Sequence, residues 1–239
     1  MTPAIGMIFS VCDGDEKHFD RFEGEIDRLG FPFAVNFDHC SQRTTARFSQ
    51  HPRFMGGYVN CDPESFFDES HRQRALDVLL YRGMDWMLQL DVDETLERDA
   101  IKKIRELAIK GIKGQRADIY TFSVLDLWGD GSHYRVDGPF DVSKREKLFN
   151  LKSDPKIHYY HPTVHAPKIC PEGREPIILK SDCRVLHWGI MNEEEAEFHC
   201  QRWDEIYTRK VGGNPYGLYR YLREKHPPKL IPVPEGVIP

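Results

Sequence analysis

Residues 84–96 read Met-Asp-Trp-Met-Leu-Gln-Leu-Asp-Val-Asp-Glu-Thr-Leu. Within this stretch an apolar run, Trp86 to Leu90, ends abruptly in three acids, Asp91, Asp93 and Glu94. The run is typical of a buried strand, and clustered carboxylates at its end are costly unless a cation neutralises them. A divalent metal with oxygen ligands is the simplest neutraliser, and the alternative is a solvated acidic turn.

The composition is that of an ordinary globular protein with a sizeable core. The chain has 239 residues, of which 40% are hydrophobic and 30% charged, and its formal net charge is -5. This acidic balance gives no general attraction to nucleic acid. No apolar run approaches the roughly 20 residues of a membrane span. The six cysteines form no CxxC pair, so we expect reduced thiols and a cytoplasmic location.

Predicted strands and helices alternate through the first half of the chain. Strands are expected at 4–11, 31–37 and 86–90, and helices at about 15–29, 70–83 and 101–111. Residues 39–69 are expected to be irregular, apart from a possible short strand near 57–60. Further strands are expected at 119–127, 134–136, 147–151 and 183–188. The alternation predicts an α/β fold with a mostly parallel sheet flanked by helices.

Four acids each follow the end of a predicted strand: Asp13, Asp38, Asp91 and Asp93. In open α/β sheets, ligands bind outside the carboxyl ends of the strands. Acids gathered at that edge therefore predict a binding site. The alternative is that each acid caps the following helix, and for Asp13 alone this is the preferred interpretation.

The acidic segment is compatible with two reactions. In nucleotide-sugar transfer, Mn²⁺ or Mg²⁺ on Asp91 and Asp93 would bridge the donor diphosphate and stabilise its charge as it leaves. In phosphoryl transfer, Asp91 would be the nucleophile and Asp93 the acid/base. The segment Asp-Val-Asp-Glu-Thr-Leu resembles the first motif of haloacid-dehalogenase-like phosphatases. That motif usually opens its domain, however, whereas here ninety residues precede it.

A wider pattern resembles the family-2-like glycosyltransferases of the GT-A fold, in particular the lipopolysaccharide-type members. The first segment, 74–94, contains Arg74, Gly83 and Asp-Val-Asp-Glu, and the second, 127–149, contains Leu-Trp-Gly-Asp, Tyr-Arg-Val-Asp-Gly and Lys-Leu-Phe. The third, 185–203, contains Val-Leu-His-Trp-Gly and Arg-Trp. Residues 38–44 also resemble a degenerate form of the family's base-binding turn. The resemblance implies a GT-A domain over 1–211 with a small antiparallel acceptor-side element, and a C-terminal extension over 212–239. It also implies a UDP-sugar donor and a hydroxyl acceptor, such as a saccharide.

The resemblance assigns a metal site to three residues. Asp91 and Asp93 match the family's DxD motif, and His187 matches a histidine that completes the metal site in many GT-A enzymes. Asp91 could instead meet the ribose, or the metal through water. Glu94 would support the site or would simply be solvated.

The resemblance also places the donor nucleotide. Asp38 would accept a hydrogen bond from the nucleobase, and Val11 and Asp13 would lie near the base and ribose. Arg74 would face the diphosphate, because a guanidinium fork suits phosphate oxygens.

The catalytic base departs from the family pattern. Ala166 stands where a glutamate is expected, which leaves His165, Asp137 and Asp141 as candidates. The departure also keeps open a non-catalytic, nucleotide-sugar-binding relic. The aromatic residues that could form an acceptor wall, or simply core, are Trp128, Tyr134, Phe140 and Tyr159.

Overall fold

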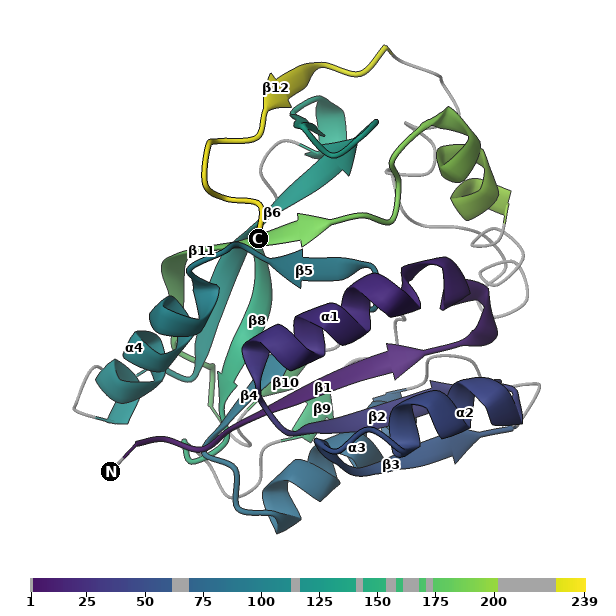
Figure 1. Ribbon diagram of the computed structural model, residues 1–239. Helices are drawn as coiled ribbons and strands as arrows, with labels where there is room; N and C mark the ends of the chain where they lie inside the picture. Colours follow the sequence, from purple (N-terminus) through teal and green to yellow (C-terminus); the bar gives the residue numbers. More distant parts are fainter. Residues whose placement is uncertain are drawn as a thin grey trace. The chain divides into compact units, whose positions relative to one another are not determined.

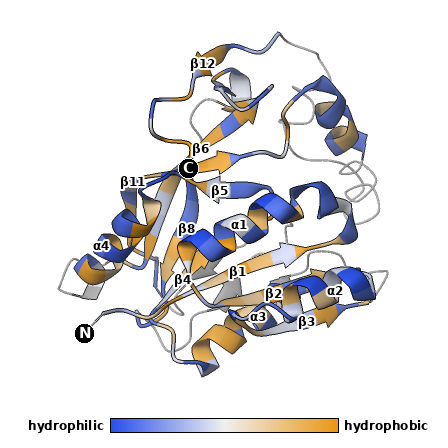
Figure 2. Ribbon diagram, in the orientation of Figure 1, coloured by the Kyte–Doolittle hydropathy of each residue, from blue (hydrophilic) through white to orange (hydrophobic). Residues whose placement is uncertain are grey.

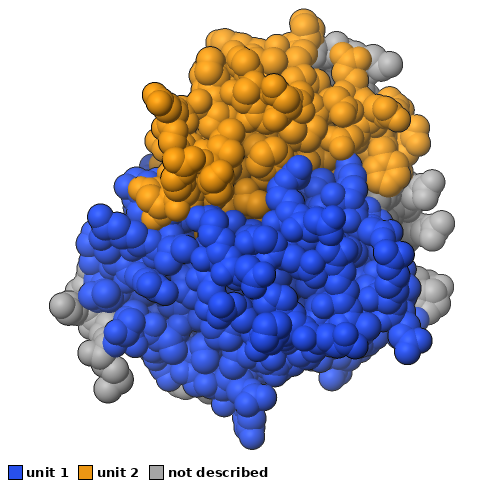
Figure 3. Space-filling view, viewed as in Figure 1, with its two compact units in different colours: residues 1–93, 100–122, 145–183 blue, residues 94–99, 123–144, 184–239 orange. Residues whose placement is uncertain are grey.

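The computed structural model describes residues 2–61, 69–112, 117–140, 144–153, 158–160, 168–170, 174–201 and 227–239. The chain forms two compact units, coloured separately in Figure 3. Unit 1 comprises residues 1–93, 100–122 and 145–183, and unit 2 comprises residues 94–99, 123–144 and 184–239. The expected boundary between 211 and 212 lies outside the described residues.

Unit 1 is built on a mostly parallel sheet (Figure 1). Its strands, in the spatial order β8-β4-β1-β2-β3, are β1 (Ile5–Val11), β2 (Phe33–Asp38), β3 (Phe54–Asn60), β4 (Trp86–Gln89) and β8 (Lys144–Asn150). β1 is parallel to β2 and β4, and β2 is parallel to β3, whereas β8 is antiparallel to β4. The predicted α/β class with a mostly parallel central sheet is confirmed.

Helices cover both faces of this sheet. They are η1 (Asp13–His18), α1 (Phe19–Leu29), α2 (Gln42–Ser49), α3 (Glu69–Tyr81) and α4 (Ala100–Ile112). Because side chains alternate along a strand, β1 serves both faces, and Figure 2 shows it hydrophobic along most of its length. On one face Phe9 packs against Phe22 of α1 and Phe48 of α2, with ring centroids 4.7 and 5.5 Å apart.

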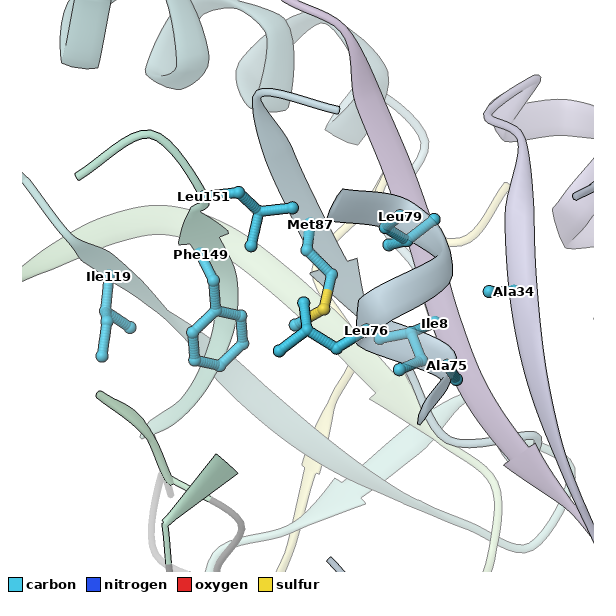
Figure 4. Packing of buried hydrophobic residues seen from close by; sticks show 9 residues of the cluster. All are labelled: Ile8, Ala34, Ala75, Leu76, Leu79, Met87, Ile119, Phe149 and Leu151. Atoms are coloured by element: carbon cyan, nitrogen blue, oxygen red, sulfur yellow. The ribbon is translucent and has the colours of Figure 1, made fainter. Parts of the chain in front are cut away.

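The opposite face is covered by α3. There Ile8 of β1, Ala34 of β2, Met87 of β4 and Phe149 of β8 form one buried cluster with α3 side chains (Figure 4). The cluster consists of Ile8, Ala34, Ala75, Leu76, Leu79, Met87, Ile119, Phe149 and Leu151. Burying these apolar side chains is the main force that fixes α3 on the sheet.

The expectation of an irregular segment at 39–69 was wrong in two places. α2 occupies Gln42–Ser49, and β3 is longer than the possible strand near 57–60. α2 is short and buries only Thr44 and Phe48, so it lacks the repeated apolar spacing that identifies a helix in sequence. Its first turn is stabilised instead by Ser41, whose hydroxyl oxygen accepts the Thr44 N–H at 3.3 Å.

Unit 2 is antiparallel. From Ser123 onward β6 (Ile119–Trp128) belongs to this unit, and it forms the predicted hairpin with β7 (His133–Arg135). β12 (Leu230–Pro232) is antiparallel to β7, and β5 (Glu94–Leu96) is antiparallel to β11 (Ile178–His187). The expected small antiparallel element is therefore present, while its role toward an acceptor stays a prediction.

Five cysteines, Cys12, Cys40, Cys61, Cys183 and Cys200, are free thiols. None of the described helices combines the length and apolarity that crossing a bilayer requires.

A buried carboxylate stabilises unit 1 in a pH-dependent way. Asp118 is 2% exposed, and it accepts hydrogen bonds from Arg174 Nη1 and Nη2 at 2.6 and 2.8 Å and from the Ile177 N–H at 2.7 Å. Burial alone raises the pKa of this carboxyl, but these hydrogen bonds and the Arg174 charge outweigh burial and lower the pKa.

We expect Asp118→Asn to remove an acid-sensitive part of the stability. Because the folded pKa lies below the unfolded value of about 3.9, the stabilisation is fully present above about pH 4 and is lost as the pH falls through the folded pKa. The variant should lose about 1–3 kcal/mol at pH 7 and much less at pH 3. Urea unfolding at both pH values measures this, and an equal loss at both would contradict the assignment.

Candidate functional site

The carboxyl ends of β1 and β2 are joined through Asp13. Its carboxylate accepts the backbone N–H of Ser41 at 3.0 Å and the Ser41 hydroxyl at 3.1 Å. Hydrogen bonding, first from Thr44 and also from Ser41, holds the pKa of Asp13 below its usual value despite slight desolvation. Asp13 therefore supports the start of α2. Val11 is buried at the end of β1, and its carbonyl oxygen accepts from the Cys40 thiol at 3.1 Å.

Asp38 is fully buried at the end of β2. Its Oδ1 accepts a hydrogen bond from Asn60 Nδ2 at 2.6 Å, and His39 Nδ1 lies 3.0 Å from the same oxygen. Among the described residues, His39 is the one non-glycine with positive φ, at 55°. Left-handed backbone is costly for such a residue and is often found at functional sites. His39 belongs to the base-binding turn expected at 38–44, whereas no site role was predicted for Asn60 from the sequence.

Asp91 follows β4 and has a close cationic neighbour. Lys147 Nζ lies 3.9 Å from Asp91 Oδ2, and the Lys147 side chain is 3% exposed while that of Asp91 is 44% exposed. Desolvation raises the pKa of Asp91, but the charges of Lys147, Arg72 and Arg145 outweigh it and lower the pKa, with Asp93 opposing them. Protein cations therefore supply at least part of the neutralisation that the sequence suggested a metal would provide.

The role of Arg74 toward the donor diphosphate stays a prediction. Arg74 is exposed on α3, and its guanidinium lies over the ring of Tyr58, 4.6 Å from the centroid. Arg72, two residues earlier, is the α3 arginine that acts on Asp91. Sequence reasoning missed Arg72 as well as Arg145 and Lys147. The sequence pattern that could have indicated Arg145 and Lys147 is their spacing of two residues, which places both on one face of a strand that also carries the buried Leu148 and Phe149.

His187 lies in unit 2 with a carboxylate partner. Its Nδ1 is 2.6 Å from Asp126 Oδ1, and both side chains are largely buried. A carboxylate at Nδ1 fixes the orientation and tautomer of an imidazole, which is common for metal-binding histidines. Glu94 lies opposite His187 in the register of the antiparallel strands β5 and β11, and it is 0% exposed. The interpretation of Glu94 as a solvated residue was therefore wrong. Asp91 and Asp93 belong to unit 1, so a metal site shared with His187 stays a prediction.

One of the three candidate bases lies among the described residues. Asp137 accepts from Arg135 Nε at 3.2 Å and from the Lys229 N–H at 3.0 Å, which gives it a structural role in unit 2. The Arg135 guanidinium also lies over the rings of Trp128 and Phe140, at 4.9 and 4.3 Å from their centroids. These two aromatic residues thus have a partner within the unit. Asp141, His165 and the Tyr159 side chain lie outside the described residues.

Asp91 and Asp93 are the expected protein ligands for Mn²⁺ or Mg²⁺ in unit 1. Within the described part of the chain, no group of three or more His, Cys, Asp or Glu side chains could hold a metal ion. Two carboxylates, such as Asp91 and Asp93, are sufficient when phosphate oxygens and water complete the coordination shell, as is usual for Mg²⁺. The acidic segment thus fits a metal that arrives with a diphosphate better than a preformed protein cage.

Comparisons with known proteins give remote structural likenesses. No protein-family model and no curated protein matches the chain. S. aureus TarS 1-349 is 11% identical to this chain, and it has also been solved in complex with UDP-GlcNAc and with UDP. The superposition on TarS 1-349 without these ligands in its description covers 91% of this chain and 68% of the TarS chain, with a TM-score of 0.47. A putative nucleotide-diphospho-sugar transferase from Desulfovibrio desulfuricans G20 is 11% identical, with coverages of 93% and 95% and a TM-score of 0.39. At such identities and scores, these likenesses do not establish the family or the activity of this chain.

Proposed function

We propose that the protein is a GT-A-type glycosyltransferase that moves a sugar from a nucleoside-diphosphate sugar, with UDP as the nucleotide, to a hydroxyl acceptor. The observation that carries the proposal is the group of charges at the carboxyl end of β4. There Asp91 and Asp93 lie among basic side chains, with Lys147 Nζ 3.9 Å from Asp91. Carboxylates beside cations suit a ligand that is itself anionic and brings a divalent metal.

The proposal gives each part of the edge a role. Asp91 and Asp93 would hold Mn²⁺ or Mg²⁺, which stabilises negative charge on the departing diphosphate. Val11, Asp13 and Asp38 would form the nucleoside end. The Asp38 carboxylate is fully buried and accepts a hydrogen bond from Asn60. A nucleobase could therefore contact Asp38 only if neighbouring residues moved, or it could bind to His39 instead. A cytoplasmic location is part of the same proposal.

A panel of nucleotide sugars tests this function. With Mn²⁺ present, we expect at least one UDP-sugar to release UDP, slowly to water and faster once a suitable saccharide acceptor is added. Calorimetry should show UDP binding to the same protein. Failure of every nucleoside diphosphate to bind, with or without metal, would rule the proposal out. Binding without any turnover across donors and acceptors would indicate the non-catalytic relic instead.

A phosphatase is the second candidate, and one contact favours it. Lys147 beside Asp91 could stabilise a phosphoryl group on an Asp91 nucleophile. Against this, three strands with their helices precede β4 among the described residues. The phosphatase predicts release of phosphate from simple phosphomonoesters and trapping of beryllofluoride at Asp91. The glycosyltransferase predicts neither.

A further inference from the structure

We propose that Arg72 competes with a divalent metal for Asp91, and that Asn36 is the acceptor to which the Arg72 side chain withdraws when the metal binds. This inference rests on the proposed function, because it concerns the metal that Asp91 and Asp93 would hold. It adds to that site a control of metal affinity that is built into the sheet and α3.

A polar row crosses the sheet just beyond the buried cluster of Figure 4. Ser10 of β1 pairs in register with Asn36 of β2, and Asn36 Nδ2 lies 3.4 Å from Ser10 Oγ. On the other side of β1, Ile8 pairs with Gln89 of β4. Two residues further on, Ser10 is therefore level with Asp91. Since adjacent strands are about 4.8 Å apart, the backbones of Asn36 and Asp91 lie on either side of Ser10, about 10 Å from each other.

Both ends of this row face α3. Ala34 of β2 belongs to the cluster under this helix, and alternation places Asn36 on the same face. Phe149 of β8 also belongs to that cluster, and alternation places Lys147 beside it. Because Lys147 Nζ lies 3.9 Å from Asp91 Oδ2, the Asp91 carboxylate is turned to the α3 face as well.

Arg72 of α3 lies over the middle of the row. It precedes Ala75 by three residues and Leu76 by four, so it shares their buried face, one turn nearer the start of the helix. Because α3 connects β3 to β4 within the parallel part of the sheet, it runs back against these strands. One turn toward its start, about 5.4 Å, thus corresponds to about two residues toward the carboxyl end of a strand, which is the step from Ile8 to Ser10.

Arg72 and Asn36 each carry a buried polar atom that lacks a partner. Arg72 Nε is a donor and Asn36 Oδ1 is an acceptor, and neither makes a hydrogen bond among the described residues. Buried polar atoms without hydrogen bonds are costly, and rotation of the Arg72 side chain would let these two satisfy each other. In the present structure the charge of Arg72 acts on Asp91 instead. Desolvation raises the pKa of Asp91, and the charges of Lys147 and then Arg72 lower it.

The Arg72 guanidinium loses its attraction to Asp91 once a divalent metal neutralises that carboxylate, and the charge of the metal repels it. The side chain then gains more by donating its Nε hydrogen to Asn36 Oδ1 than by staying beside Asp91. Without this acceptor the guanidinium would stay near the metal and weaken its binding. Arg72 thus lowers the affinity for metal, and Asn36 limits that effect.

Titration of the full chain with Mn²⁺ at saturating UDP, measured by calorimetry, tests the inference. Arg72→Met removes the competing charge and keeps an apolar stem, so Mn²⁺ should bind about fivefold or more tightly. Asn36→Leu removes the acceptor at nearly constant shape and should weaken Mn²⁺ binding about threefold or more. In the double variant, Asn36→Leu should have no further effect, because the guanidinium is absent. Arg82→Met is the matched control for the loss of one charge, since Arg82 is exposed just beyond the other end of α3.

The outcomes separate this inference from the proposed function. Unchanged Mn²⁺ affinity in Arg72→Met would overturn the inference, and weaker Mn²⁺ binding would do so by showing that Arg72 supports the bound ligands. An effect of Asn36→Leu that persists in the double variant would show that Asn36 acts through packing. A wild-type chain that binds neither UDP nor Mn²⁺ would overturn the proposed function itself. Urea unfolding identifies a loss of folding in Asn36→Leu, and in that case Arg72→Met alone decides.

Discussion

Asp93→Asn is expected to lower the rate of sugar transfer by about 10²–10³-fold or more, the size of effect seen when one preorganised electrostatic contact to a developing anion is removed. The amide keeps the shape of the side chain but loses the charge that would hold Mn²⁺ or Mg²⁺. Since Asp93 lies in a half-buried turn, the fold should tolerate the change. The measurement is UDP release under saturating donor with Mn²⁺, with and without acceptor.

One comparison makes this result specific. Asp77→Asn is the matched control, because Asp77 is an exposed acid of α3 that contacts Gln73, and its rate should stay within about twofold of the wild type. A wild-type rate in Asp93→Asn would show that this carboxylate does not hold a catalytic metal.

Gly57→Val should destabilise unit 1 by about 3 kcal/mol, at the upper end of the usual cost of overpacking. A Cβ at Gly57 would lie 2.5 Å from the carbonyl oxygen of Val35 on the neighbouring strand. This neighbour is backbone within the paired strands β2 and β3, so it cannot rotate away. Relief of the clash requires the strands to move apart, which weakens their hydrogen bonds at the edge that carries Asp38 and Asn60.

The matched control is Gly24→Ala on α1. Nothing lies within 4 Å of a Cβ added there, and alanine is the better helix former, so a gain of about 0.5–1 kcal/mol is expected. Urea unfolding at constant pH measures both variants. A Gly57→Val midpoint equal to that of the wild type would mean that β2 and β3 are not packed as closely as described.

Elements with strong local patterns were predictable. The apolar run before Asp91 became β4, and the apolar spacing at 70–83 and 101–111 became α3 and α4. The Asp130–Gly131 turn became the β6–β7 hairpin, where Gly131 has a φ of 85°. Each of these depends on neighbours within a few residues, so composition and periodicity suffice. α2 was missed because a single external contact network, from Asp13 to Ser41, stabilises its start.

The sequence by itself determined an α/β chain with acids at the ends of its strands. It did not determine what surrounds those acids. Arg72 precedes Asp91 by nineteen residues, and Lys147 follows it by fifty-six. Only the packing of α3 on the sheet and the antiparallel pairing of β8 with β4 bring them to one point. Tertiary structure therefore decides how far protein cations, and not a metal, neutralise these carboxylates, because Coulomb energy depends on distance in space and not on separation along the chain.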